Sequence, residues 1–291
     1  MVSADLATIG DELRERIRER IQQKLPDLDP AKVFFSATHT HSAPGFGSRS
    51  LARDAALAKE CGWELPPEWA DWGIELEAMP GTEYREFAAE RIAGAVEQAW
   101  NARQPGGVGF GLGHAVVGHN RLVAYDSGRS QMYGSTDRAD FSHVEGYEDH
   151  SVNLLYTWSA DRKLTGVAVN VAVPSQAGGG SRVSADFWHE TRNELCSRLG
   201  EGLFVIPQCS AAGDQAPNVL VDKKAEARME RLTGRSRRGM IAARIADAVV
   251  PEVHPLPVAA ALHERLVLVV RLHEVADQRH QPLGHGHQFH Q

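Results

Sequence analysis

The chain has 291 residues, of which 42% are hydrophobic and 24% are charged, with a formal net charge of -7 and an isoelectric point near 6.1. This length and composition allow one large domain, or two small ones, with a sizeable core. The acidic balance argues against a nucleic-acid partner, since binding to phosphates requires a clustered basic face. Its three cysteines have neither the even number of a disulfide framework nor the spacing of a Cys-based zinc site.

The first predicted element is a helix whose apolar residues recur every third or fourth position from Leu6 to Leu25. The residues before it lack the charged-then-apolar pattern of a signal peptide. No run of apolar residues in the sequence is long enough to span a membrane. We therefore expect no transmembrane segment and, for the chain as it stands, a cytoplasmic location.

A strand is predicted next at Val33–Thr38, and it runs into the loop Ala37–Gly45, which contains His39 and His41. On a strand these two side chains would point to the same face, because side chains alternate with period two. Two neighbouring imidazoles with hydroxyls nearby suit a metal ligand beside a partner that contacts substrate. The alternative is a hydrogen-bonded surface turn that contains two histidines.

After a long polar excursion at Ser48–Pro80, helical and strand patterns alternate along the chain. The predicted elements are a helix at Glu83–Asn101, strands at Val108–Val117, Val152–Trp158, Thr165–Val173 and Leu203–Ile206, a helix capped by Ser184 and ended by Gly200, and a charged helix at Lys224–Val249. The second and third of these strands are expected to form an antiparallel hairpin. The alternation predicts an α/β fold, a layered mixed β-sheet with flanking helices.

Residues 1–272 are assigned to one domain, because neither a linker nor an internal repeat interrupts them. The residues at 273–291 are rich in His and Gln and show no apolar periodicity. This composition predicts a disordered tail, with adventitious metal binding as the alternative.

The loop Gln208–Asn218 follows directly on a short buried strand and contains a Gly-Asp pair at Gly213 and Asp214. Small residues at such a place describe a tight loop whose backbone approaches another group closely. In α/β sheets ligands gather at the carboxyl ends of strands, which is where this loop and the histidine loop are both expected. The alternative for Asp214 is an Asx turn ahead of Pro217.

Three segments, in this order and spacing, resemble the N-terminal catalytic domain of the neutral/alkaline (non-lysosomal) ceramidases. They are His39–Gly45, the pair Asn120 and Arg121, and Gly213–Asn218. Three more segments resemble a bacterial, mostly uncharacterised branch of that family: Tyr133–Gly134, Glu145–His150 and Ser184–Glu190. The resemblance extends from Val2 to Leu272 and implies a fold of the neutral-ceramidase catalytic-domain type, truncated here at both ends, in a family whose members are often secreted.

The resemblance implies a zinc-dependent hydrolase of an N-acyl (amide) bond in a sphingolipid-like or other N-acylated small molecule. It places a Zn²⁺ ligand at His39, an imidazole beside the reacting carbonyl at His41, and a group that binds polar substrate atoms at Arg121. Zinc lowers the pKa of bound water, and a nearby Arg or His adds positive charge where an oxyanion develops. The alternative for Arg121 is a salt bridge to a carboxylate such as Asp126.

The chain departs from the family pattern at two positions that matter for catalysis. The family's nucleophilic serine falls on Ala216, whose methyl group cannot attack a carbonyl. A second zinc histidine of the family falls on Pro174, which cannot coordinate the metal. The family's remaining ligands, a glutamate and a tyrosine, belong beyond Leu272.

Other residues of the chain are candidates to replace these missing groups. Ser210 lies six residues before Ala216 and could act as a nucleophile by a different loop path, with Asp214 as a further catalytic candidate. His189, on the helix after Ser184, is the candidate second metal ligand, and the alternative is a histidine on the polar face of that helix. Two functions follow: a hydrolase in which water on the metal replaces the serine, or a catalytically degenerate or truncated homologue that keeps the fold without turnover.

Overall fold

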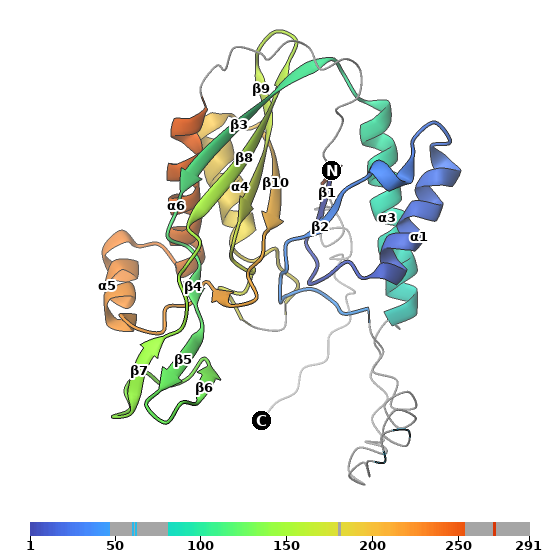
Figure 1. Ribbon diagram of the computed structural model, residues 1–291. Coiled ribbons are helices and arrows are strands. Elements are labelled where there is room, and N and C mark those ends of the chain that lie inside the picture. The colour runs from blue at the N-terminus through green and yellow to red at the C-terminus, as the bar shows by residue number, and fades with distance from the viewer. Residues whose placement is uncertain (47–59, 61, 63–80, 180–181, 254–269, 272–291) are drawn as a thin grey trace, which may run out of the picture.

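The computed structural model describes residues 1–46, 60, 62, 81–179, 182–253 and 270–271 (Figure 1). The helices are α1 Asp11–Lys24, α3 Gly81–Asn101, α4 Phe187–Leu199, α5 Lys223–Thr233 and α6 Arg237–Val249, with 3-10 turns η1 Pro30–Lys32 and η3 Val250–Glu252. The strands are β1 Val2–Ala4, β2 Phe35–Ala37, β3 Gly106–His114, β4 His119–Asn120, β5 Leu122–Tyr125, β6 Ser130–Met132, β7 Phe141–Val144, β8 Ser151–Ser159, β9 Leu164–Val171, β10 Phe204–Cys209, β11 Gln215–Ala216 and β12 Val270–Arg271. The predicted tail and nearly all of the predicted excursion lie outside the described residues.

The largest sheet has the strand order β10-β9-β8-β3. β8 and β9 form the predicted antiparallel hairpin, β3 pairs antiparallel with β8, and β10 pairs parallel with β9. Helices α4 and α6 cover one face of this sheet (Figure 1). The predicted α/β fold with a layered mixed β-sheet and flanking helices is therefore confirmed.

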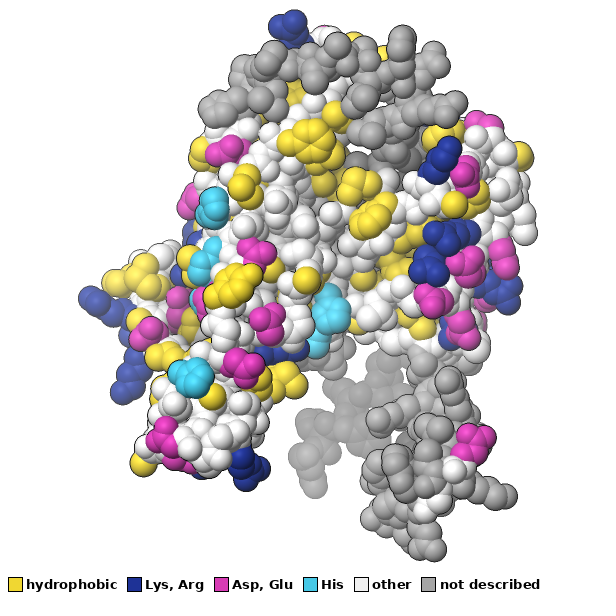
Figure 2. All heavy atoms as spheres, in the orientation of Figure 1, with side chains coloured by type: hydrophobic (Ala, Val, Ile, Leu, Met, Phe, Trp, Pro, Cys, Tyr) yellow, Lys and Arg dark blue, Asp and Glu magenta, His cyan; other side chains and the backbone are white. Residues whose placement is uncertain are grey.

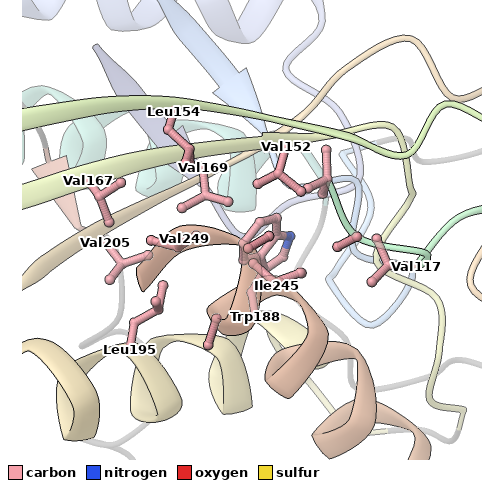
Figure 3. Close-up of a cluster of buried hydrophobic side chains, with 14 of the residues drawn as sticks. Val117, Val152, Leu154, Val167, Val169, Trp188, Leu195, Val205, Ile245 and Val249 are labelled. Atoms are coloured by element: carbon pink, nitrogen blue, oxygen red, sulfur yellow. The ribbon is translucent and has the colours of Figure 1, made fainter. Parts of the chain in front are cut away.

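The half of the molecule that contains this sheet has its core between the sheet and helices α4 and α6 (Figure 3). Inward-facing residues of the strands, such as Leu154, Val169 and Val205, meet Trp188 of α4 and Ile245 of α6. Full burial of each such aliphatic side chain contributes roughly 1.5–3 kcal/mol, so this cluster supplies much of the stability of the sheet layer.

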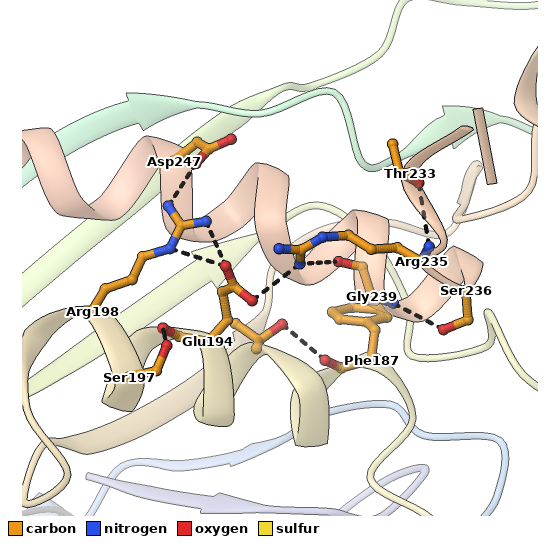
Figure 4. Close-up of polar contacts among 10 residues, drawn as sticks. Phe187, Glu194, Ser197, Arg198, Thr233, Arg235, Ser236, Gly239 and Asp247 are labelled. Carbon is orange, nitrogen blue, oxygen red and sulfur yellow. Dashed lines mark hydrogen bonds and ion pairs between the residues drawn. The ribbon is translucent and has the colours of Figure 1, made fainter. Parts of the chain in front are cut away.

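A polar network ties the two helices together at the edge of this core (Figure 4). Glu194 of α4 accepts hydrogen bonds from Arg198 and from Arg235, and Arg198 also pairs with Asp247 of α6. Hydrogen bonds to the two arginines hold the pKa of Glu194 below its usual range.

The second half is built on the parallel sheet β12-β1-β2, against which α1 and α3 pack. Ile17 and Ile21 of α1 meet Ile92 of α3 in its core. Lys, Arg, Asp and Glu side chains mix over the outer surface of α1 and α3 (Figure 2), where Arg20 pairs with Glu86 and Glu90. The strand β1 was not predicted, because three residues are too few to show a period.

Several predicted elements differ from the observed ones in their bounds, and for two of the helices the contacts show the reason. The charged helix at Lys224–Val249 is two helices, since Gly234 takes a left-handed conformation (φ 65°) and Ser236 caps α6 by accepting from the Gly239 N–H. The helix after Ser184 begins later than predicted, because Asp186 is its N-cap and accepts from the Phe187 N–H. Among the described residues, no helix has the length and apolar content needed to cross a bilayer.

Candidate active site

The histidine loop begins where β2 ends and is held by the segments that follow β9. The His41 N–H donates to the Ser175 carbonyl over 3.0 Å, and the Thr40 hydroxyl donates to the Ser184 carbonyl over 2.8 Å. His39 is left-handed (φ 56°), so the strand alternation has already ended at this residue. The rings of His39 and His41 nevertheless lie side by side, with centroids 5.2 Å apart and planes at 66°.

The surroundings of His41 favour its neutral form. Burial lowers the pKa of this imidazole most, and the electrostatic effects of His39 and Arg121 lower it further, while Asp186 acts in the opposite direction. At neutral pH His41 therefore presents an uncharged imidazole that can accept a proton.

Arg121, the residue between β4 and β5, lies in the same region as His41. Its Nε and Nη2 donate to the Gly213 carbonyl over 3.2 and 2.6 Å, and its Nη1 donates to the Tyr133 hydroxyl over 3.1 Å. Gln176 Nε2 donates to that same hydroxyl over 2.7 Å. These acceptors of Arg121 are neutral, so its positive charge is fixed in position without being cancelled by an acidic partner there. The Arg121 guanidinium is held by these contacts and not by a salt bridge to Asp126, which was the alternative expected from the sequence.

Asp214 contacts Arg121 through its backbone and Asn120 through its side chain. Its carbonyl accepts from the Arg121 N–H over 3.0 Å, and its Oδ2 accepts from Asn120 Nδ2 and Gln215 Nε2 over 3.3 and 3.2 Å. The short ladder between β4 and β11 brings these groups together. Asp214 thus links the loop after β10 to Arg121, and its catalytic role stays a prediction.

Ala216, at which the sequence resemblance places a nucleophilic serine, carries no hydroxyl. This residue is fully buried in β11, opposite His119. Ser210 is held by its backbone N–H, which donates to the Val171 carbonyl over 3.0 Å. Among the described residues, no hydrogen bond connects the Ser210 side chain to His41 or Arg121, and its role as nucleophile stays a prediction.

The predicted metal ligands are placed on different elements. His189 lies exposed on the first turn of α4, with its Nε2 3.2 Å from Asn193 Nδ2. The part of the chain that the structure describes contains no group of three or more His, Cys, Asp or Glu side chains arranged to hold a metal. A catalytic zinc takes three protein ligands, so the described residues alone do not complete a zinc site, and the ligand roles of His39 and His189 stay predictions.

Three residues of this region share an uncommon backbone conformation. His39, Tyr133 and Asp186 are non-glycine residues with φ of 56°, 56° and 53°. Such residues concentrate at functional sites, where surrounding contacts must hold them. For Asp186 the contacts are visible, because its buried carboxylate accepts from the N–H groups of Ala177 and Gly178 as well as from α4.

Sequence reasoning missed the roles of Tyr133, Gln176 and Asp186 in this site. A Tyr-Gly pair and a Ser-Ala-Asp ahead of a helix were visible in the sequence, but nothing there connects either of them to Arg121 or to the loop after β9. From the sequence alone, an aspartate at the start of a helix, as at Asp186, indicates only a charge favoured by the helix dipole. Its cap position is real, and its second role is to hold the loop that follows β9.

The sequence matches no family model and no curated protein. The solved structure of a neutral ceramidase from Pseudomonas aeruginosa is similar over 86% of this chain, with a TM-score of 0.57 and 17% sequence identity. This chain has the neutral ceramidase fold. A second structure, a ceramidase complexed with C2, is similar over the same share at 17% identity and a TM-score of 0.54. The chain spans only 36% and 35% of the lengths of these two ceramidase chains.

The predicted resemblance to the neutral ceramidases is therefore confirmed at the level of the fold. Within this ceramidase fold, the loops that follow β2, β9 and β10 lie together at the carboxyl ends of their strands. The His41 N–H donates to the Ser175 carbonyl, and the Ser210 N–H donates to the Val171 carbonyl. The carboxyl ends of the strands are the position at which ligands gather in α/β sheets.

Proposed function

We propose that this chain is a ceramidase-like hydrolase of an N-acyl (amide) bond in a sphingolipid-like or other N-acylated small molecule. The observation that carries the proposal is the meeting of His41 and Arg121, from distant parts of the sequence, at the strand ends of a ceramidase fold. An imidazole that is kept neutral and a guanidinium that is held by neutral acceptors are complementary to a polarised amide.

In this proposal Arg121 and Tyr133 bind the carbonyl oxygen and stabilise the negative charge that develops on it. Both groups are already oriented, because Gly213 and Gln176 hold them before any ligand binds. Preorganised donors of this kind contribute much of the rate enhancement in acyl-transfer catalysis. His41 accepts a proton from the attacking group and returns it to the leaving nitrogen.

Zn²⁺ is the cofactor that the resemblance implies, with His39 and His189 as proposed ligands. When bound, zinc would lower the pKa of a water molecule and so supply a hydroxide without a serine nucleophile. Because the described residues do not bring three ligands together, the roles proposed above are those of the chain's own side chains.

A second candidate function is binding of the same N-acylated molecules without turnover. The observation that favours it is the burial of Ala216, with 0% exposure, where the family has its nucleophile. A methyl group in a filled position leaves no hydroxyl to attack the carbonyl.

The two candidates are separated by one assay with matched variants. Fatty-acid release from N-acylsphingosines with short and long acyl chains is measured with added zinc and again after chelation, for the parent chain, Arg121→Gln and Ala216→Ser. We expect release by the parent and at least a tenfold lower kcat/KM in Arg121→Gln, about 1.4 kcal/mol of transition-state binding. Arg138→Gln is the control, because that exposed arginine pairs with Asp140.

Each outcome of the assay decides something. Release that requires zinc supports the metal-dependent hydrolase. No release, together with substrate binding that Arg121→Gln weakens, favours the second candidate. Neither release nor binding contradicts both candidates, and a gain of activity in Ala216→Ser shows that only the nucleophile was missing.

A further inference from the structure

The segment Glu145–His150 carries a half-buried carboxylate, Glu148, that lies against Asn120. Glu148 Oε1 accepts from the Asn120 N–H over 3.0 Å. Its other oxygen, Oε2, lies 3.0 Å from His150 Nε2 and 3.3 Å from His119 Nδ1. One carboxylate therefore bridges two imidazoles and the backbone of the residue that precedes Arg121.

We propose that Glu148, held by His119 and His150, is a positioning residue that keeps Arg121 in the orientation in which it meets a ligand. The importance of that orientation rests on the proposed function. The positioning itself rests on contacts between side chains, and it can be measured without any turnover.

The strand that directly precedes Arg121, β4, is weakly paired. The ladder between β4 and β11 has only two residue pairs. Asn120 is nevertheless buried, with 4% exposure, so its N–H requires a partner inside the protein. Glu148 supplies that partner, and hydrogen bonds to a charged acceptor are the stronger ones.

A series of hydrogen bonds connects Asn120 to the guanidinium of Arg121. Asn120 Oδ1 accepts from the Leu122 N–H over 2.9 Å, and its Nδ2 donates to Asp214, so it braces the backbone on both sides of Arg121. Arg121 is then held by the Asp214 carbonyl at its N–H and by Gly213 at its side chain. The Arg121 carbonyl also accepts from the Tyr133 N–H over 2.7 Å. A displacement of Asn120 would therefore shift the backbone of Arg121 relative to the Asp214 and Gly213 carbonyls that hold it.

The segment Glu145–His150 approaches Asn120 closely. Gly146 has a φ of 73°, and a Cβ at this position would lie 2.8 Å from Asn120 Nδ2. Only glycine combines this conformation with this distance. The Tyr147 carbonyl also accepts from Gln215 Nε2 over 3.3 Å, so the segment is tied to β11 as well. These contacts leave Glu148 in place against Asn120.

The experiment measures the Arg121 Nε–H group by ¹H–¹⁵N NMR in the full chain, because this hydrogen donates to the Gly213 carbonyl. In Glu148→Gln the amide can accept from Asn120 but cannot also accept from two imidazoles, so we expect at least tenfold faster exchange of the Nε–H with water. Glu145→Gln, which changes an exposed carboxylate of the same segment, is expected to match the parent chain. An unchanged exchange rate in a folded Glu148→Gln protein overturns the proposal.

A second variant keeps the test decisive if Glu148→Gln does not fold. His119→Gln/His150→Gln retains Glu148 but replaces both imidazoles, and it is also expected to accelerate the Nε–H exchange; an unchanged rate there overturns the proposal. If the chain hydrolyses N-acylsphingosine, Glu148→Gln and Arg121→Gln are expected to lower kcat/KM non-additively. Absence of hydrolysis contradicts only the proposed function, because the NMR measurement does not depend on it.

Discussion

At the scale of single residues, His41 shows how the surroundings of a side chain change its chemistry. Burial and the electrostatic effects of His39 and Arg121 lower its pKa, although Asp186 opposes them. A neutral imidazole at the strand ends of a ceramidase fold is suited to move protons, whereas a protonated one would repel the Arg121 guanidinium. The same group therefore links the acid–base chemistry of the site to the stability of the fold.

We predict that His41 titrates at a lower pH in the folded chain than in the urea-unfolded chain. Because its folded pKa is the lower one, the unfolded state binds more protons between the two values, and stability is lost as the pH falls through that window. NMR titration with a chelator present measures both midpoints, and urea unfolding across the same window measures the slope. His41→Gln is expected to flatten this slope, and a slope that is identical in the variant would contradict the assignment.

At the scale of elements, α6 packs so closely on β3 that glycine is required between them. A Cβ on Gly113 would lie 2.5 Å from the Ala248 carbonyl oxygen, which belongs to the backbone of α6 and cannot give way as a side chain would. Gly94, in the middle of α3, has no heavy atom within 4 Å of the same position. Gly113 is therefore required for the close approach of α6 to β3, whereas the position of Gly94 has room for a side chain.

We predict opposite signs for Gly113→Ala and Gly94→Ala. Gly113→Ala is expected to lower the free energy of unfolding by about 1–3 kcal/mol, because overpacking displaces the helix. Gly94→Ala is expected to raise it by about 0.5–1 kcal/mol, because alanine loses less backbone entropy in a helix. Urea unfolding of both variants measures the difference, and equal effects would mean that the close approach of α6 to β3 is wrong.

At the scale of the whole molecule, buried polar contacts connect the half around α4 to the half around β1. Arg192 of α4 donates twice to Asp5, over 3.0 and 3.1 Å, and the two side chains are only 6% and 14% exposed. The Ser3 hydroxyl also donates to the Pro207 carbonyl over 2.6 Å. These contacts join β1 and the residue after it to α4 and β10.

We predict that Arg192→Met lowers the free energy of unfolding by about 3 kcal/mol, because it leaves the Asp5 carboxylate without its bidentate partner. Arg138→Met is the matched control, since it breaks an exposed pair with Asp140 and is expected to cost at most about 1 kcal/mol. Thermal or urea unfolding distinguishes the two. A loss for Arg192→Met no greater than that for Arg138→Met would show that the pair does not join the halves.

The sequence by itself determined the elements whose residues repeat over many positions, and it indicated the loops that we propose to carry chemistry. The helix at Glu83–Asn101 and the β8–β9 hairpin were predicted because their apolar period is local. His39 and His41 stood out because two imidazoles at a strand end are poorly explained by packing, whereas Arg121 stood out through the resemblance to the ceramidases. The assignment of residues 1–272 to one domain stays a prediction.

Only the tertiary structure decided which groups meet at the site. Four residues contact segments that are distant in the sequence: Tyr133, Gln176, Asp186 and Glu148. The local periodicity of the sequence does not reveal such contacts. The tertiary structure also decided that Ala216 is buried and that Arg121 is held by the Gly213 carbonyl and the Tyr133 hydroxyl instead of by Asp126. The physical reason is that periodicity reports which face of an element is buried, while the orientation of a polar side chain depends on partners that only folding brings within hydrogen-bond distance.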